Sequence, residues 1–350
     1  MDSHSSKATP KMESYTAGET AGITLGIIFG IALLLFLMLY ALKLWMRGPT
    51  KGSDNPKKLD GKLVVITGAN TGIGKVTATD LAKRGARVII CCRDLIRAED
   101  AAKDIRQESG SDLVQVQQLD LASFKSVRKC AQHLLENEDK IDYLINNAGV
   151  MRCPQWKTED GLEMQMGTNH FGHFLFTELV MPLIKKSAAS GHHPRIVIVS
   201  SLAHYWDPAG INFEDIHNEK NYDPKKVYGQ SKLANILHAK ELARKLNNTG
   251  ISVYVLHPGV IATELGRHLA NQTPKWIGCW LFPLFQWVAK SPFHGAQTTL
   301  YCTLEDKIEC ESGNYYSDCD KAPTKIAQAE DEDAAKKLWE LSEKIVGLKE

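Results

Sequence analysis

The stretch LVVITGANTGIGKVTATDLAKRGARVIICCRD, residues 63–94, predicts a strand, a glycine-rich turn, a helix and a second strand. Its first five residues are apolar and rich in β-branched side chains, as is typical of a strand buried on both faces. Gly68, Gly72 and Gly74 then allow a tight turn and a close approach of the backbone to a ligand. The helix that follows presents its N-terminal N–H groups and positive dipole end, which suit a pyrophosphate.

The glycine spacing is GxxxGxG rather than GxGxxG, so the prediction of a dinucleotide site rests on the flanking strand and helix. The second predicted strand, residues 87–92, ends at Arg93 and Asp94. At this place an acidic residue binds the ribose 2′-hydroxyl of NAD, whereas an arginine accommodates the 2′-phosphate of NADP. Because Arg93 comes first and a guanidinium suits a phosphate, the sequence favours NADP(H).

A candidate acid–base pair lies further along the chain, where Tyr228 and Lys232 stand four residues apart in YGQSK. Positions i and i+4 share one face of a helix, so the ammonium of Lys232 can lie beside the phenol of Tyr228. An adjacent cation favours the phenolate, and we expect it to lower the pKa of Tyr228 by roughly 1–3 units. Such a phenol can exchange a proton with an alcohol or a carbonyl near neutral pH. The pattern is common on helix surfaces, so its weight comes from the upstream glycine turn.

Predicted strands alternate with helical patterns along the rest of the chain. This alternation indicates a parallel sheet with right-handed crossovers, in which cofactors bind outside the carboxyl ends of the strands. The glycine turn, NNAG, the end of IVIVSS and HPG all follow predicted strands, so we expect them at one edge of the sheet. The predicted strands lie near residues 63–67, 87–92, 113–119, 141–145, 195–201, 251–257 and 314–316, and a charged C-terminal helix is predicted over 328–347.

The motifs TGANTGIG, LDLAS, NNAG, TNHFGHF, IVIVSS, YGQSK and HPGVIAT resemble, in this order, those of the short-chain dehydrogenases/reductases. The resemblance runs from about Lys62 to the C-terminus. The stretches SSLAH and SGNYYSDC resemble the membrane-anchored retinol dehydrogenase group in particular. The family implies a Rossmann-type, doubly wound, mostly parallel seven-stranded sheet, with hydride transfer between NADP(H) and a carbon that bears oxygen.

The resemblance also implies roles for particular residues. Ser201 would hydrogen-bond the substrate oxygen and Tyr228 would exchange a proton with it. Lys232 would hold the ribose hydroxyls and tune Tyr228, and Asn169 would anchor a water molecule of a proton relay. Because neighbouring strand residues point to opposite faces, only one of Ser200 and Ser201 can face the substrate, and the group's serine corresponds to Ser201. The implied cofactor-binding residues are Gly68, Asn70, Thr71, Gly72, Ile73, Gly74, Arg93, Asp120, Asn147, Ala148, Gly149, Tyr228, Lys232, Pro258, Gly259 and Thr263.

Residues 21–42 contain no charged side chain and are rich in Ile, Leu, Phe, Gly and Ala. A bilayer span needs about 20 such residues, whereas a signal peptide has an apolar region of roughly 7–15. We therefore predict a transmembrane anchor over residues 21–42, after a short lumenal tail (1–20) and before a linker (43–60) and a catalytic domain (61–350).

The charges that flank this segment predict its orientation. Basic residues gather after it, whereas the residues before it mix both signs. Because the basic side faces the cytoplasm, we expect a single-pass membrane protein with a cytosolic catalytic domain, most simply in the endoplasmic reticulum. The basic residues after the segment are Lys43, Arg47, Lys51, Lys57 and Lys58.

The segment 262–293 differs from the rest of the catalytic domain, because PKWIGCWLFPLFQWVAK is crowded with tryptophan and phenylalanine. In the family, the matching segment covers the substrate, so one interpretation is an apolar substrate lobe that dips into the membrane surface. The alternative is a lobe packed on the domain or on a second subunit. A long lipophilic alcohol or aldehyde fits both the lobe and the anchor.

Composition excludes several other classes. The formal net charge of +1 gives no basic field for nucleic acid. The eight cysteines show no CxxC or Cys/His ligand spacing, so neither a metal site nor a disulfide framework is predicted. His170 and His173 fit a helix near the active cleft better than a metal pair. A homodimer through the two long helices that flank Ser201 is common in the family.

The leading hypothesis is therefore a membrane-bound NADP(H)-dependent enzyme that interconverts a retinoid-like alcohol and its carbonyl form. A steroid or general lipid-carbonyl oxidoreductase is the alternative within the same class. From a different class, a catalytically silent NADP-binding membrane scaffold would lack one of Asn169, Ser201, Tyr228 or Lys232, and all four are present.

Overall fold

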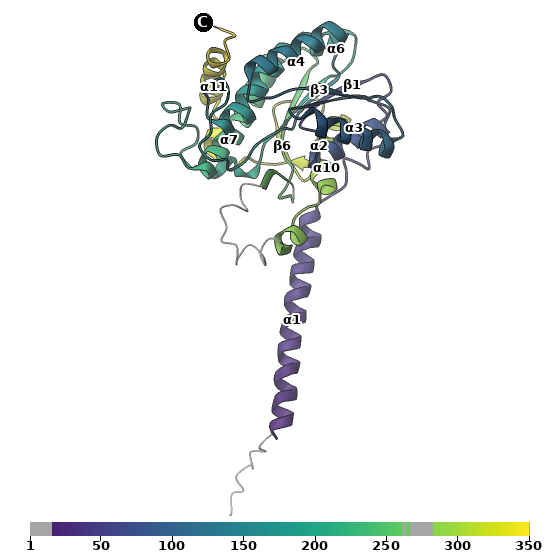
Figure 1. Cartoon of the computed structure of the whole chain (residues 1–350), viewed down its shortest axis with the longest axis vertical. Coiled ribbons are helices and arrows are strands. Elements are labelled where there is room, and N and C mark those ends of the chain that lie inside the picture. Colours follow the sequence, from purple (N-terminus) through teal and green to yellow (C-terminus); the bar gives the residue numbers. More distant parts are fainter. Residues whose placement is uncertain (1–15, 262–263, 267–282, 350) are drawn as a thin grey trace, which may run out of the picture. The chain divides into compact units, whose positions relative to one another are not determined.

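The computed structural model describes residues 16–261, 264–266 and 283–349 of the chain (Figure 1). The chain divides into two compact units, Met1–Trp45 and Met46–Glu350. Each unit has its own architecture, and the second one carries the predicted catalytic motifs.

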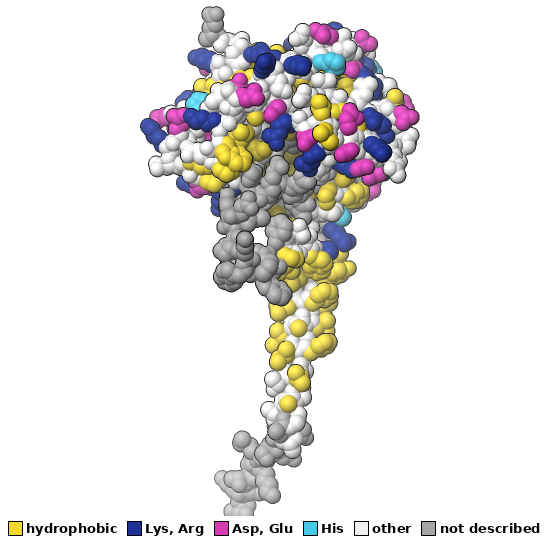
Figure 2. Space-filling view, viewed as in Figure 1, with side chains coloured by type: hydrophobic (Ala, Val, Ile, Leu, Met, Phe, Trp, Pro, Cys, Tyr) yellow, Lys and Arg dark blue, Asp and Glu magenta, His cyan; other side chains and the backbone are white. Residues whose placement is uncertain are grey.

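The first unit contains most of helix α1 (Ala17–Arg47). Among the described residues, its stretch Thr20–Arg47 is the one helical segment long and apolar enough to cross a membrane, with a mean hydropathy of 2.7. Hydrophobic side chains cover the visible surface of this helix (Figure 2). No part of its apolar window is buried inside the protein, which distinguishes it from a core helix and supports membrane association of the chain.

The second unit is built on an eight-stranded sheet in the order β3-β2-β1-β4-β5-β6-β7-β8. Seven of these strands, β1 to β7, run parallel to one another, which confirms the predicted Rossmann-type sheet. The eighth strand was not predicted, because it has two residues and pairs antiparallel with β7 across a turn at Asp318 and Cys319 that contains no glycine. The strands are β1 (Leu63–Thr67), β2 (Arg87–Cys92), β3 (Val114–Gln118), β4 (Tyr143–Asn146), β5 (Arg195–Val199), β6 (Ser252–His257), β7 (Tyr315–Ser317) and β8 (Asp320–Lys321).

Helices cover both faces of the sheet, as the buried runs of its central strands require. Within β1, Leu63 and Val65 pack into one hydrophobic core, while Val64 and Ile66 pack into the other. The first core lies under α4 (Phe124–Asn137), α6 (Gly172–Ala189), α7 (Pro224–Lys245) and α11 (Glu332–Ile345), and the second under α2 (Gly72–Lys83), α3 (Leu95–Ser109) and α10 (Pro292–Leu304). The short helical segments are α5 (Met164–Met166), η1 (Gly167–Phe171), η2 (Leu202–Tyr205), η3 (Glu264–Gly266), η4 (Asp306–Ile308) and η5 (Ala327–Glu330).

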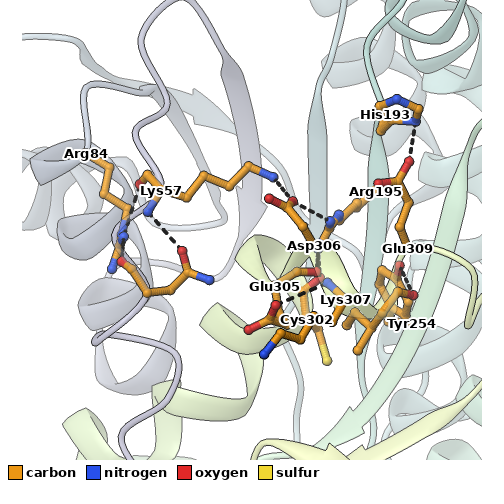
Figure 3. A network of polar contacts seen from close by, with 12 residues as sticks. Lys57, Arg84, His193, Arg195, Tyr254, Cys302, Glu305, Asp306, Lys307 and Glu309 are labelled. Atoms are coloured by element: carbon orange, nitrogen blue, oxygen red, sulfur yellow. Dashed lines mark hydrogen bonds and ion pairs between the residues drawn. The ribbon is translucent and has the colours of Figure 1, made fainter.

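The segment expected to be a linker, residues 43–60, is bound to the second unit over much of its length. The guanidinium of Arg84 donates to the carbonyl oxygens of Ser53 (2.9 Å) and Lys57 (3.1 Å), and also to that of Asn55. The ammonium of Lys57 pairs with Asp306, so the segment is fastened to η4 as well (Figure 3). These contacts make residues 52–57 part of the folded catalytic unit.

Helix α11 covers a face of α6 and α7. The ring of Trp339 lies edge-on to Phe174, with ring centroids 4.9 Å apart, and tilted against His238 at 5.8 Å. The hydroxyl of Ser342 is 2.8 Å from Nε2 of His170. A homodimer through α6 and α7, as expected from the family, would have to accommodate this helix.

Candidate active site

A cavity of about 290 Å³ lies at the carboxyl ends of β1, β2, β3 and β4. Most of the residues that were predicted to bind the cofactor line it. Tyr228, Lys232, Pro258 and Gly259 lie outside this lining, and Thr263 lies outside the described residues. The predicted residues that line the cavity are Gly68, Asn70, Thr71, Gly72, Ile73, Gly74, Arg93, Asp120, Asn147, Ala148 and Gly149.

The glycines of the turn are required by its close packing against the loop that follows β4. Gly68 has φ of +65°, and a Cβ there would lie 2.8 Å from the Cβ of Ala148. A Cβ on Gly74 would lie 2.5 Å from Nδ2 of Asn147. Any side chain at either place would push the two loops apart and disturb the cavity lining that they form.

Thr67, the last residue of β1, joins the glycine turn to the same loop. Its hydroxyl oxygen accepts from the backbone N–H groups of Asn147 and Ala148, each at 3.0 Å. The side-chain amide of Asn147 donates in return to the carbonyl oxygens of Thr67 (2.8 Å) and Gly68 (3.2 Å). Sequence analysis did not single out Thr67, because this role depends on a contact some 80 residues away.

The end of the cavity formed by β2 carries the residues that bear on cofactor choice. Arg93, Asp94 and Arg97 all line it. The carboxylate of Asp94 accepts from the backbone N–H of Arg97 at 3.1 Å and so caps the N-terminus of α3. The acidic side chain is thus engaged in the helix cap, and Arg97 is a second cationic residue that sequence analysis missed.

Asn169 lies in η1, a π-helical turn in which the N–H of Gly172 bonds to the carbonyl oxygen of Gly167. Such turns frequently occur at functional sites. The side chain of Asn169 accepts from the N–H of Val150 (2.8 Å), and donates to the carbonyl of Val150 (2.9 Å) and to the hydroxyl of Ser231 (2.9 Å). Its amide therefore fastens the loop after β4 to α7, which leaves the backbone carbonyl as the group suited to hold a water molecule.

The two serines after β5 point in different directions, as expected for adjacent residues of an extended chain. The hydroxyl of Ser200 is buried and donates to the carbonyl oxygen of Lys232 at 2.7 Å. The hydroxyl oxygen of Ser201 instead accepts from the N–H of Ala203 at 3.1 Å, and its side chain lies close enough to the phenol of Tyr228 to act on the pKa of that phenol. The structure thus brings together the serine and the tyrosine that were predicted to face the substrate.

Lys232 lies on α7, four residues after Tyr228, with its Nζ 5.8 Å from the centroid of the tyrosine ring. Its ammonium is buried and donates to the carbonyl oxygen of Val199, the last residue of β5, at 3.1 Å. Gly149, which lines the cavity, faces it: a Cβ there would lie 3.5 Å from Nζ of Lys232 and 3.2 Å from Oδ1 of Asn169. The cavity, the amide and the ammonium therefore meet at Gly149.

The expectation that Lys232 lowers the pKa of Tyr228 is wrong for this arrangement. Burial raises the pKa of Tyr228 to about 12, and the nearby side chain of Ser201 opposes this only in part. Burial lowers the pKa of Lys232 to about 8. Desolvation outweighs attraction here because the ammonium lies beside the ring rather than within hydrogen-bonding reach of the phenol oxygen.

The loop after β6 is held by Lys290, a residue that the sequence did not reveal. Gly259 has φ of +101°, and a Cβ there would lie 2.6 Å from Cδ of Lys290. The N–H of Lys290 donates to the carbonyl oxygen of Val260 at 2.9 Å, and its ammonium pairs with Asp318. Pro258 and Gly259 therefore stand at the same sheet edge as Ser201, fixed from behind by a buried cation.

Large apolar side chains are exposed beside this loop. Val260, Leu284, Phe285 and Phe293 each expose between 40% and 44% of their surface. Leu284, Phe285 and Phe293 belong to the predicted lobe (262–293), and Val260 precedes it. Three other aromatic residues of the lobe, Trp276, Trp280 and Phe282, lie outside the described residues.

No group of three or more His, Cys, Asp and Glu residues in the described ranges is arranged to hold a metal ion. His170 and His173, for which a helix near the active cleft was preferred to a metal pair, bond to different partners. His170 contacts Ser342 on α11, and His173 contacts Thr67 on β1.

Comparison with known proteins agrees with this geometry. The short chain dehydrogenase family matches residues 62–274. Retinol dehydrogenase 13 of Mus musculus is 48% identical over 293 residues, which cover 83% of this chain and 85% of that protein. Retinol dehydrogenase 14 of Homo sapiens is 47% identical over 313 residues, which cover 85% of this chain and 90% of that protein.

Solved structures give the same result. An uncharacterised protein of Mycobacterium paratuberculosis is similar with a TM-score of 0.66 and 34% identity, over 86% of this chain and 98% of that one. The RhlG–NADP complex of Pseudomonas aeruginosa is similar with a TM-score of 0.57 and 27% identity, over 74% of this chain and 94% of that one. Together with the cavity and the ordered motifs, these matches identify a nicotinamide dinucleotide site. The chain belongs to the short-chain dehydrogenase family and is an NAD(P)-dependent oxidoreductase.

Proposed function

We propose that this chain is a membrane-anchored, NADP(H)-dependent oxidoreductase that interconverts a lipophilic alcohol and its aldehyde or ketone, with retinoids as the substrate class. The observation that carries the proposal is the buried ammonium of Lys232, which lies 5.8 Å from the ring centroid of Tyr228 and against Gly149 of the cofactor cavity, with Ser201 close to the phenol. A site that only bound a dinucleotide would have no need of this arrangement.

Each residue has a role in the proposed reaction. When bound, the nicotinamide supplies or accepts the hydride. Ser201 donates a hydrogen bond to the substrate oxygen and holds it beside the phenol. In reduction the phenol of Tyr228 gives its proton to that oxygen as the carbon receives the hydride, and in oxidation the phenolate takes the proton back. Lys232 has N–H donors left for the ribose hydroxyls, because an ammonium has three and one goes to Val199.

The choice of NADP(H) is supported by the β2 end of the cavity. Two guanidinium side chains, Arg93 and Arg97, line this end beside a single carboxylate, Asp94, which also caps α3. A guanidinium attracts a 2′-phosphate and gains little from a 2′-hydroxyl. We therefore expect Arg93→Gln to weaken NADPH binding roughly 10–100-fold, the worth of one charge-assisted pair, while NADH binding changes little. Titration of both dinucleotides followed by fluorescence tests this, and equal losses for both would contradict the assignment.

The substrate class is supported by the relatives and by the surface. Several similar proteins are named retinol dehydrogenases. The exposed Val260, Leu284, Phe285 and Phe293 border the loop after β6, and helix α1 supplies an apolar segment of membrane-spanning length. A retinoid partitions into lipid, so a membrane anchor and an apolar rim suit its delivery. The basic residues after residue 42 support a cytosolic catalytic unit, with the endoplasmic reticulum as the proposed membrane.

One assay tests the function as a whole. The detergent-purified full chain is given NADPH or NADH with all-trans-retinal, a ketosteroid or a short aldehyde. We expect NADPH-dependent reduction of retinal with the highest kcat/KM of the panel. A ketosteroid preference would replace the substrate class, and NADPH binding without turnover of any carbonyl would favour a silent binding protein.

Tyr228→Phe isolates the chemical step. The variant removes only the oxygen that transfers the proton, so NADPH affinity stays and turnover falls on the order of 10²–10⁴-fold. Val227→Ala, a change at a buried neighbour on the same helix turn, is the packing control. Turnover of Tyr228→Phe within a few-fold of the wild type would remove the tyrosine from the mechanism.

A further inference from the structure

We propose that His173 is a positioning residue, which holds the Asn169 carbonyl in place and couples it to the end of β1. The proposal concerns the proposed oxidoreductase reaction and rests on that function. It starts from a fully enclosed histidine that the mechanism above does not use. His173 is 2% exposed and lies in the first turn of α6.

Both ring nitrogens of His173 have partners. Nδ1 is 3.0 Å from the carbonyl oxygen of Asn169, and Nε2 is 2.9 Å from Oγ1 of Thr67. The first partner belongs to the π-helical turn η1, and the second ends β1 at the glycine turn. The ring therefore bridges the two segments that carry the proposed relay residue and the cofactor cradle.

The hydrogen-bond capacities fix the tautomer of the ring. A carbonyl oxygen only accepts, so Nδ1 must carry the proton. The hydroxyl oxygen of Thr67 already accepts from the N–H groups of Asn147 and Ala148, so it has a proton to donate and its lone pairs are engaged. Nε2 must then be the acceptor, and His173 is neutral with its proton on Nδ1.

Protonation of His173 would break this arrangement, because a second N–H would point at a hydroxyl oxygen with no free lone pair. Burial lowers the pKa of His173 to about 4, and the nearby cation Lys232 on α7 acts in the same direction. The other titratable groups near it are His170 in η1 and His238 on α7, and the pKa of each is also lowered by burial. The ring therefore stays neutral over the working pH range.

The hydrogen bond from His173 holds the backbone carbonyl of Asn169 in one position. The π-turn departs from regular helical bonding, and the bond from His173 holds its carbonyl while the side chain fastens Val150 and Ser231. A carbonyl keeps a second lone pair, which is free to hold the relay water. Loss of the histidine would let this carbonyl shift, and a shift of about 1 Å in a relay can cost on the order of 10²-fold in rate.

The test uses the detergent-purified full chain with NADPH and retinal. We expect His173→Phe to lower kcat at least roughly tenfold, with KM for retinal and NADPH affinity nearly unchanged, and to shift the pH profile of kcat. His173→Gln, which again offers a donor and an acceptor, should recover most of the lost kcat. His170→Phe is the matched control, since it changes an equally buried histidine of the preceding turn that bonds to Ser342 on α11. It should lower the melting temperature without moving the pH profile.

If His173→Phe fails to fold, Thr67→Val breaks the same bond from β1, with Thr67→Ser as its hydroxyl-retaining control. Thr67→Val should lower kcat and add an acid limb to the pH profile, because Nε2 of His173 loses its donor and can take up a proton. Separate measurement of NADPH affinity reports the lost contacts to Asn147 and Ala148. Wild-type kcat and pH profile in a folded His173→Phe or Thr67→Val protein would overturn the inference. An inactive wild type would instead refute the proposed function.

Discussion

A buried cation lies at each end of strand β5, and the two cations differ in the number of protein groups to which they donate hydrogen bonds. At the first residue, the guanidinium of Arg195 donates to the carbonyl oxygens of Cys302 (3.2 Å) and Glu305 (2.7 Å) and to the carboxylate of Asp306 (3.3 Å) (Figure 3). At the last residue, the carbonyl of Val199 accepts a single bond from the ammonium of Lys232.

The two cations are almost equally buried, since Arg195 is 1% exposed and Lys232 is 3% exposed. They differ in how many hydrogen bonds they donate to other groups of the protein. Arg195 also lies over the ring of Tyr254, 5.7 Å from its centroid. Removal of a buried cation that bonds several protein groups leaves those groups unpaired, whereas a buried cation with few protein partners has donors for a ligand. We infer that Arg195, at the amino edge of the sheet, has a structural role. We infer that Lys232, at the carboxyl edge, takes part in the reaction.

The largest expected effect is a loss of activity when the cation at the carboxyl end of β5 is removed. Lys232→Met should lower kcat on the order of 10³-fold, because it removes the cation that is proposed to hold the ribose beside Tyr228. The folded fraction should not fall, since the change removes a charge whose burial is poorly compensated. Steady-state kinetics with thermal unfolding in parallel tests this, and a destabilised but active variant would reverse the comparison.

The matched change at the amino end of β5, Arg195→Met, should lower stability and leave activity nearly unchanged. It removes the donors that meet Cys302, Glu305 and Asp306 and should reduce the free energy of unfolding by about 1–3 kcal/mol, because two carbonyl groups lose their partners whereas the carboxylate of Asp306 stays exposed to water. The kcat of the protein that remains folded should stay within about twofold of the wild type, because the site lies at the other edge of the sheet. Denaturant titration at pH 7 measures the loss, and a loss below about 1 kcal/mol would show that the network contributes little.

The pH dependence of stability sharpens the comparison. Burial lowers the pKa of Lys232 to about 8, below its usual value of 10.5, so between these values the unfolded chain binds more protons than the native one. The contribution of Lys232 to stability therefore rises with pH from about 8 to about 10, by about 2–3 kcal/mol. The difference in unfolding free energy between wild type and Lys232→Met should change by this amount over that window. A difference independent of pH would mean that the ammonium is not desolvated.

The smallest effect concerns Glu178, a partly buried carboxylate on α6 at neither end of β5. Burial and, to a lesser extent, Glu343 raise its pKa to about 7. Between its usual pKa of 4.5 and about 7, the native state binds more protons than the unfolded state, so stability falls as pH rises through this window. Glu178→Gln should therefore stabilise the protein by about 1–2 kcal/mol at pH 8, after allowance for its partial exposure, and have little effect at pH 4.5. Equal effects at both pH values would contradict this account.

The cofactor half of the site was predictable because its signals are local. A buried strand, three glycines and a helix start are contiguous in residues 63–83, and each enforces the same backbone path. The structure places these residues around one cavity together with Arg93, Asp120 and residues 147–149. The strands were located to within about two residues at each end, apart from the two-residue β8.

The substrate half was less predictable. The motifs gave Asn169, Ser201, Tyr228 and Lys232, and the structure brings the last three together at the carboxyl edge of β5. The pKa direction of Tyr228 was wrong because spacing on a helix places the ammonium beside the ring but says nothing about desolvation. Most of the predicted lobe (262–293) lies outside the described residues, so its role as a substrate cover stays a proposal.

By itself the sequence determined the Rossmann-type sheet, the cofactor cradle, the family and an apolar helix of membrane-spanning length, because these follow from backbone conformation and from periodic or continuous hydrophobicity. Only the tertiary structure decided how each buried polar group is satisfied. The side chain of Asn169 bonds to Ser231, and the bond to the Asn169 carbonyl fixes the tautomer of His173. Lys290 packs against Gly259, and Arg84 binds the backbone of residues 52–57. The physical reason is that desolvation and hydrogen-bond capacity depend on neighbours brought from distant parts of the chain, and these neighbours leave no local trace in the sequence.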